Sequence, residues 1–62
     1  MKLWKTGQIA PVTGIYQFVR YADPGPPYPK PTRDEQEIPL DEGDRFPPIA
    51  STGRSAWYKR KR

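Results

Sequence analysis

Cysteine and histidine are both missing from this chain of 62 residues. Without cysteine there is no disulfide to supplement a small core, and without either residue the usual ligands of a structural zinc are absent. A chain of this length buries only about 60% of the surface that its unfolded form exposes, so we expect one marginally stable domain over residues 1–62. We also expect no metal and no cofactor.

Long hydrophobic runs are missing as well. No apolar run approaches the roughly 20 residues that are needed to cross a bilayer. The first residues, Met1–Lys5, lack the apolar region of a signal peptide. We therefore expect a cytoplasmic protein with no membrane partner.

The inventory for catalysis is poor. Six of the seven acidic residues lie between Asp34 and Asp44, in a polar segment where nothing apolar would raise a carboxyl pKa. The spacing of Asp41, Glu42 and Asp44 lacks the alternating ligands and closing glutamate of a calcium-binding EF-hand loop. So short a chain also offers no dry pocket for preorganised groups. We expect that the protein is not an enzyme.

Proline, in contrast, is abundant, with nine residues in the chain and five of them between Asp23 and Thr32. Each proline restricts the unfolded chain and stabilises the fold by about 0.4 to 1 kcal/mol at a compatible site. Residues 23–32 are therefore predicted to form an extended Pro-rich loop. The PxxP spacing of Pro26 and Pro29 is that of a ligand for a Pro-recognising groove, and a stiffened surface loop is the alternative.

The segment Gly14–Tyr21 is the richest in β-branched and aromatic residues and is predicted to be the central strand. Turn-forming residues bound it on both sides. Strict alternation places Tyr16, Phe18 and Arg20 on one face of this strand. Gly14 is expected to adopt a backbone conformation that other residues avoid.

Shorter elements are predicted around the central strand. They are an edge strand or arm within 2–6, a helical turn in 33–37, a strand at 37–40, a turn at 41–44 with Gly43 left-handed, and a last strand at 55–59. The predicted fold is all-β, with three or four antiparallel strands in a meander or barrel-like sheet. In the last strand either Trp57 or Tyr58 faces inward. The predicted core is Tyr16, Phe18, Val19, Ile38, Leu40, Phe46 and Trp57.

Three stretches of the sequence resemble the YjzC-like family of small bacterial proteins. They are Thr6-Gly7-Gln8-x-Ala10-Pro11-x-x-Gly14-x-Tyr16, Leu40-x-x-Gly43-Asp44-x-Phe46-Pro47 and Trp57-x-Lys59. The resemblance leaves out Tyr21 to Glu37, which looks like a Pro-rich insertion. It implies relatedness and carries no established activity to this chain.

The same framework is similar to a zinc ribbon that has lost its cysteines. Laid on that pattern, the four cysteine positions fall on Phe18, Tyr21, Ile49 and Thr52. Our hypothesis is a degenerate ribbon whose metal is replaced by an apolar cluster of Phe18, Tyr21 and Ile49. Each buried ring of such a cluster contributes about 1.5 to 3 kcal/mol without any ligand.

The charge distribution suggests two kinds of partner. The net charge is +4, and five basic residues without an acidic one lie from Arg54 to Arg62. Beside Trp57 and Tyr58 these cations are typical of nucleic-acid binding, although solvated surface charge is the simpler interpretation. The candidate nucleic-acid residues are Arg54, Lys59, Arg60, Lys61 and Arg62, of which 59–62 are expected to form a basic C-terminal tail.

A protein partner is the first expectation. An edge strand and a stiff Pro-rich loop are common materials of a small accessory subunit. Trp4, Tyr28 and Tyr58 are the candidate anchors, because aromatic rings supply contact area at low entropic cost. The sequence thus predicts a non-catalytic binding module, with protein as the first partner and nucleic acid as the alternative, and leaves the oligomeric state open.

Overall fold

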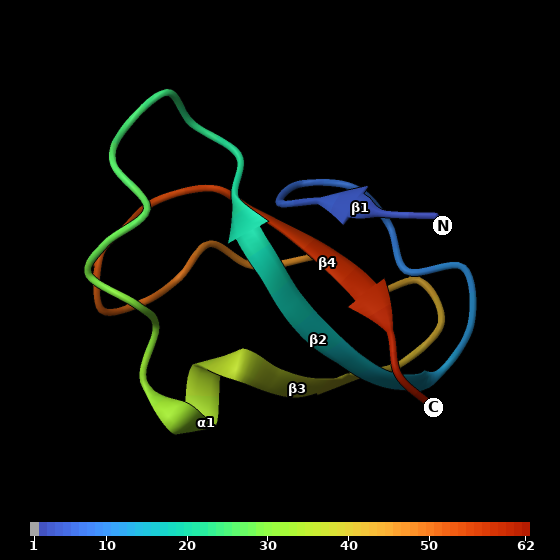
Figure 1. Cartoon of the computed structure of the whole chain (residues 1–62). Coiled ribbons are helices and arrows are strands. Elements are labelled where there is room, and N and C mark those ends of the chain that lie inside the picture. The colour runs from blue at the N-terminus through green and yellow to red at the C-terminus, as the bar shows by residue number, and fades with distance from the viewer. Residues whose placement is uncertain (1) are drawn as a thin grey trace.

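A computed structural model describes residues 2–62, and Met1 of the expected domain lies outside them (Figure 1). The elements are β1 (Trp4–Lys5), β2 (Gly14–Tyr21), α1 (Arg33–Gln36), β3 (Glu37–Leu40) and β4 (Ala56–Arg60). They build one four-stranded antiparallel sheet in the order β1-β4-β2-β3. The predicted all-β antiparallel fold is confirmed. The sheet remains open, and because β4 lies between β1 and β2 its order is not that of a meander.

β2 has the predicted bounds, but its two faces differ from the prediction. Phe18 pairs with Tyr58, whereas Arg20 pairs with Trp57, so one extra residue of β2 is accommodated between the two pairs. Such a β-bulge changes the phase of the side chains. Tyr21 is consequently buried and Arg20 is exposed, and the prediction that Arg20 shares a face with Tyr16 was wrong.

The core lies on one face of the sheet and is built largely from aromatic rings. The Tyr16 and Phe46 rings meet edge to face with centroids 4.9 Å apart, and Trp4 stacks on Phe46 at 6.0 Å. In Figure 1 the segment between β3 and β4, which carries Phe46, passes behind the sheet. The buried residues are Ala10, Tyr16, Tyr21, Phe46, Ile49, Ala56 and Tyr58, with Trp4, Phe18, Ile38 and Leu40 packed against them.

Two residues of the predicted core lie outside it. Trp57 is half-buried on the opposite face of β4, because Ala56 and Tyr58, its neighbours in the strand, both point into the core. The inward residue of this pair is therefore Tyr58. Val19 sits at the bulge and is also only half-buried.

The expected basic tail begins inside the sheet. Lys59 and Arg60 belong to β4, and the ladder continues past it, since Ile15 N–H donates to the Arg62 carbonyl at 2.6 Å and Lys61 N–H donates to the Ile15 carbonyl at 2.7 Å. The backbone of 59–62, which was expected to form a tail, is thus held against β2.

Gly14 is required for space rather than for its backbone angles. The left-handed glycines are Gly7, Gly43 and Gly53, at φ of 96°, 94° and 70°, so the prediction for Gly43 is confirmed and that for Gly14 was wrong. A Cβ on Gly14 would lie 2.2 Å from the carbonyl oxygen of Arg62. The close approach of the C-terminal strand therefore excludes a side chain there.

Three of the four positions that match zinc-ribbon cysteines, Phe18, Tyr21 and Ile49, belong to the core or pack against it. Tyr21 and Ile49 are both in the buried cluster, and Phe18 meets the Tyr21 ring at 5.2 Å. Within residues 2–62 no three His, Cys, Asp or Glu side chains are grouped to hold a metal ion.

Over the same residues, no helix is long and apolar enough to span a membrane.

Candidate functional site

The face of the sheet opposite the core carries cations around one indole. Because side chains directly across antiparallel strands share a face, Lys5 and Arg20 both flank Trp57, and Gln17 lies across from Lys59. We call this surface the basic face. It comprises Lys5 of β1, Gln17 and Arg20 of β2, and Trp57 and Lys59 of β4.

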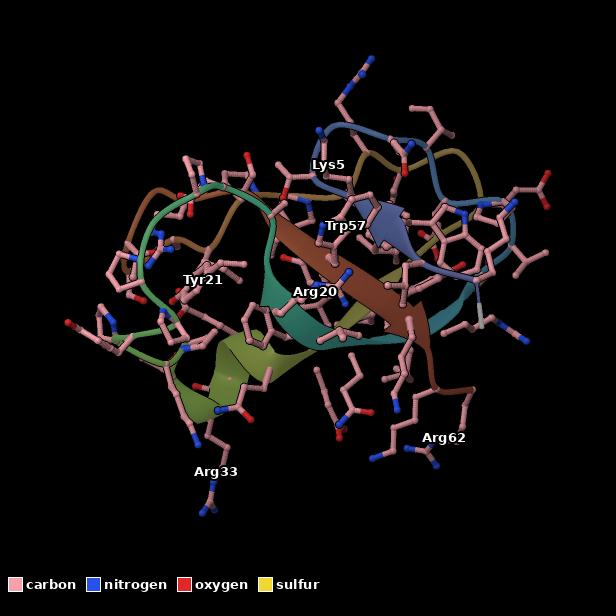
Figure 2. All side chains as sticks on the ribbon, turned by 45° about the horizontal axis from the view of Figure 1, so that its top comes forward. Lys5, Arg20, Tyr21, Arg33, Trp57 and Arg62 are labelled. Carbon is pink, nitrogen blue, oxygen red and sulfur yellow. The ribbon has the colours of Figure 1, made fainter. Side chains whose placement is uncertain are left out.

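Trp57 lies at the centre of the basic face. The Lys5 Nζ is 5.9 Å from the centroid of its ring, and the Arg20 guanidinium carbon is 6.0 Å from it. Figure 2 shows these three side chains side by side in front of the sheet, while Arg33 points away at the opposite end of the molecule. The two cations that flank the ring come from different strands, β1 and β2, so sheet formation brings them together.

Acidic charge on this face is already neutralised. Glu37 lies across from Gln17 and is paired with Lys61, whose Nζ is 2.5 Å from its carboxylate. Within residues 2–62 the only other ion pair joins Arg54 to Asp23. The cations of the basic face therefore have no carboxylate at ion-pair distance.

A basic cleft of about 470 Å³ adjoins this face. Trp4 lies beneath the Lys2 ammonium, which is 5.9 Å from the ring centroid. The cleft brings together predicted residues of both kinds: Trp4 as an anchor for a protein partner, and Lys59, Arg60 and Lys61 for nucleic acid. Its lining is Lys2, Trp4, Gln17, Lys59, Arg60 and Lys61.

A second cleft, of about 370 Å³, lies beside the C-terminal half of β2, and we call it the edge groove. Two basic side chains, Arg20 and Lys30, line it, and no acidic one does. Arg20 is shared with the basic face. The lining is Phe18, Val19, Arg20, Tyr21, Pro27, Lys30, Pro31 and Gln36.

Arg54 lines neither of the two clefts and is not part of the basic face. Its guanidinium forms an ion pair with Asp23, donates to the carbonyls of Pro26 and Tyr28 at 2.7 and 3.1 Å, and lies 3.7 Å from the centroid of the Tyr21 ring. The hydrogen bond from Arg54 lowers the pKa of Asp23, and the same bond raises the pKa of Arg54. This predicted nucleic-acid residue thus fixes the Pro-rich loop.

The other sequence-predicted residues are dispersed. Tyr28 is 67% exposed on the Pro-rich loop and is not part of the basic face. Tyr58 is buried and donates to the Pro47 carbonyl at 2.9 Å, and burial raises its pKa to about 12. Tyr58 therefore belongs to the core and presents no surface to a partner. Arg62 contributes its backbone to the end of the sheet.

Three of the five residues of the basic face were not predicted from the sequence. Lys5, Gln17 and Arg20 were not candidates, because strand pairing and the bulge decide which residues surround Trp57. One signal was available, since alternation in 55–59 places Trp57 and Lys59 on one face. A basic residue in each neighbouring strand could then have been sought beside them.

Together these features define a small mainly-β domain whose candidate site is a surface of cations around an indole. A family model described as YjzC-like protein matches residues 1–59, and the chain belongs to that family. Comparison with curated proteins gave no match, and comparison with solved structures gave none.

Several of the residues that carried the family resemblance have structural roles. Ala10, Tyr16 and Phe46 are buried, Gly43 is left-handed, and Gly14 has no room for a side chain. These stretches therefore specify the fold. Among the resembling residues, the basic face includes only Trp57 and Lys59.

Proposed function

We propose that this chain is a non-catalytic binding module that holds single-stranded nucleic acid on its basic face. The observation that carries the proposal is the position of Trp57 between Lys5 and Arg20, with Lys59 beside them. An aromatic ring among cations matches a base and its flanking phosphates. We further propose that it acts in the cytoplasm, where RNA is abundant.

The energetic balance favours exchange of the flanking cations for a base. A cation over an exposed ring contributes about 0.5 to 1 kcal/mol, so Lys5 and Arg20 together contribute about 1 to 2 kcal/mol. A base stacked on the same ring contributes about 1 to 3 kcal/mol. The displaced Lys5 and Arg20 remain available for phosphates, whose contacts release condensed counterions. Base stacking on Trp57 and contacts of the cations with the phosphates therefore both contribute to the binding free energy.

A single strand suits this surface better than a duplex. Stacking on Trp57 requires a base with a free face, and the bases of a duplex already stack on one another. The basic cleft beside Lys59 extends the positive surface along the sheet. This arrangement favours a strand that follows the sheet surface from the cleft to Trp57.

The test is fluorescence anisotropy with labelled 15-nucleotide oligo-U and oligo-dT, compared with a hairpin duplex. We expect the single strands to bind more tightly than the duplex. If the three free cations contact phosphates, log affinity should fall with log salt at a slope near −2, at about −0.7 per contact on single strands. Trp57→Ala should weaken binding about tenfold or more, and Trp57→Phe should retain most of it.

Matched charge variants locate the site. Lys5→Gln should weaken binding and make the salt slope shallower by about one contact. Arg33→Gln removes the same charge from exposed α1, away from the basic face, and should change little. Equal effects of the two substitutions would show that only net charge attracts the oligonucleotide, and the proposed site would then be wrong.

A further inference from the structure

β2 is a central strand of the sheet, but its C-terminal half has an open edge. β3 pairs with β2 from Gly14 to Gln17 and goes no further, because the chain enters β3 from α1 at Glu37. β4 continues along the other side of β2 as far as Tyr21. From Phe18 to Tyr21, β2 therefore has a neighbouring strand on one side only.

The edge groove lies along this unpaired part of β2. Its lining includes every residue from Phe18 to Tyr21, and the Phe18 and Tyr21 rings meet there at 5.2 Å. Pro27, Lys30 and Pro31 of the Pro-rich loop and Gln36 of α1 line it as well. The groove thus combines an open strand edge with apolar and basic side chains.

The side formed by the Pro-rich loop is fixed in place. Tyr21 donates its hydroxyl to the Pro29 carbonyl, and Arg54 donates to the carbonyls of Pro26 and Tyr28. Gln36 Nε2 donates to the Pro31 carbonyl at 3.0 Å. A groove held by these bonds is formed before a partner arrives, which lowers the entropic cost of binding.

The two outer edges of the sheet are less suited to pairing. β1 has two residues, and β3 contains Pro39, which has no N–H to donate. The open stretch of β2 contains no proline. Phe18–Tyr21 carries the bulge, which leaves its donors and acceptors less regularly spaced, but it is longer than β1 and, unlike β3, contains no proline.

We propose that the edge groove binds an extended acidic peptide of a partner protein, which adds as a strand to the open edge of β2. Because the bulge takes up one of the four residues, the remaining three at about 3.3 Å each give a pairing length of about 10 Å. Backbone hydrogen bonds supply affinity, and alternate side chains of the peptide enter the groove. Arg20 and Lys30 line the groove without a carboxylate, so acidic side chains are the complementary charge.

This site is separate from the proposed nucleic-acid contact at Trp57, although Arg20 borders both. A peptide on the edge of β2 leaves the Trp57 ring uncovered. The protein would then bind an acidic segment of a partner protein and a single-stranded nucleic acid at the same time. Lys30 lines the edge groove but not the basic cleft, and it is not part of the basic face. A substitution of Lys30 therefore tests the peptide proposal without changing the proposed nucleic-acid contact.

The test selects peptides from a displayed library of random 12-residue sequences on the immobilised full chain. We expect enriched peptides to be acidic and to lack proline in their central four residues. A synthesised enriched peptide should lose at least tenfold in affinity when alternate backbone amides are methylated, because methylation removes strand donors and keeps the side chains. Amide exchange should slow at Phe18–Tyr21 when the peptide is bound.

Charge variants complete the test. Lys30→Glu should weaken the peptide at least tenfold, whereas Arg33→Glu, the same change outside the groove, should alter its affinity less than twofold. Lys30→Glu should leave most of the oligonucleotide affinity intact. Failure to enrich any peptide, enrichment of basic peptides, or full affinity after amide methylation would each overturn the proposal. If Lys30→Glu instead impairs oligonucleotide binding as strongly as Trp57→Ala does, the groove belongs to the nucleic-acid site and the peptide proposal fails.

Discussion

Arg54 holds both carboxylate oxygens of Asp23, with Nε 2.8 Å from Oδ2 and Nη2 2.6 Å from Oδ1. This forked geometry is specific to a guanidinium. Because the same guanidinium also bonds Pro26 and Tyr28, it connects the start of the Pro-rich loop to the residues that precede β4. The contact fixes the loop that lines the edge groove.

Replacement of Arg54 should therefore loosen the Pro-rich loop. Arg54→Lys keeps the charge but loses the fork and its contacts with the loop carbonyls, so we expect a lower Tm and faster amide exchange at Gly25, whose N–H donates to Asp23 Oδ1. Arg54→Ala should lower the Tm further. Thermal unfolding and amide exchange measure the two effects. Equal exchange in the wild type and Arg54→Ala would show that Arg54 is not needed to hold the loop.

The opposite orientations of Trp57 and Tyr58 give a second prediction. Tyr58 is 1% exposed and packs against Phe46 with ring centroids 5.3 Å apart, so Tyr58→Ala should cost about 3 to 5 kcal/mol and unfold much of a marginal domain. Trp57→Ala removes a half-buried ring from the other face and should leave the chain folded. Circular dichroism and urea unfolding of both variants test this assignment.

The unfolding measurements on Trp57→Ala and Tyr58→Ala are also a control for the oligonucleotide-binding experiments. A folded Trp57→Ala protein is the condition under which its loss of oligonucleotide affinity can be attributed to the ring. If Trp57→Ala unfolds while Tyr58→Ala does not, the assignment of core and surface along β4 is reversed.

Much of the fold was predictable because local signals agree with it. Gly14–Tyr21 and Glu37–Leu40 have the predicted bounds, and α1 occupies Arg33–Gln36 where one helical turn was expected. The bulge in β2 was not predictable, because it depends on how β2 pairs with β4. That single extra residue exchanged the faces of Arg20 and Tyr21.

The candidate site was predicted less well for the same reason. A cluster of cations in the sequence suggested one site from Arg54 to Arg62, yet Arg54 bonds Asp23 and Lys61 bonds Glu37. Lys5 and Arg20 lie far from this cluster in sequence and reach Trp57 only through strand pairing. Composition indicates how many cations there are, whereas topology decides which of them remain available.

Glu35 should make stability depend on acid pH. Its carboxylate accepts hydrogen bonds from the Ser51 hydroxyl and N–H at 2.7 and 2.8 Å and from Thr32 N–H at 2.9 Å. These bonds, with that from the Ser51 hydroxyl as the largest effect, lower its pKa from 4.5 to about 2. A lowered folded-state pKa means that this stabilisation is present above about pH 4.5 and is lost as the pH falls towards 2.

Urea unfolding of the wild type and Glu35→Gln across this range tests the prediction. We expect the wild type to be the more stable above pH 5 and the difference to shrink as the pH falls. Asp34→Asn, on the same helical turn, is the matched control and should leave the pH dependence of stability largely unchanged. A stability difference between the wild type and Glu35→Gln that is independent of pH would contradict the assignment.

Gly14→Ala should test how the C-terminal strand closes on β2. The added Cβ would meet the Arg62 carbonyl oxygen at 2.2 Å and the Arg60 Nε at 2.9 Å, and the backbone oxygen cannot rotate away as a side chain can. We expect a cost of about 1 to 3 kcal/mol, as for other overpacked sites. The bonds of Ile15 with Lys61 and Arg62 should break first.

A chain that ends at Arg60 supplies the control for Gly14→Ala, because it removes the carbonyl that the new Cβ would meet. In that shorter chain the substitution should cost much less than in the full chain, and the difference measured by urea unfolding is the contribution of the close approach. If the cost is the same in both chains, the Arg62 carbonyl is not its source. The steric explanation would then be wrong, and 61–62 would contribute little to holding the basic residues of β4 in place.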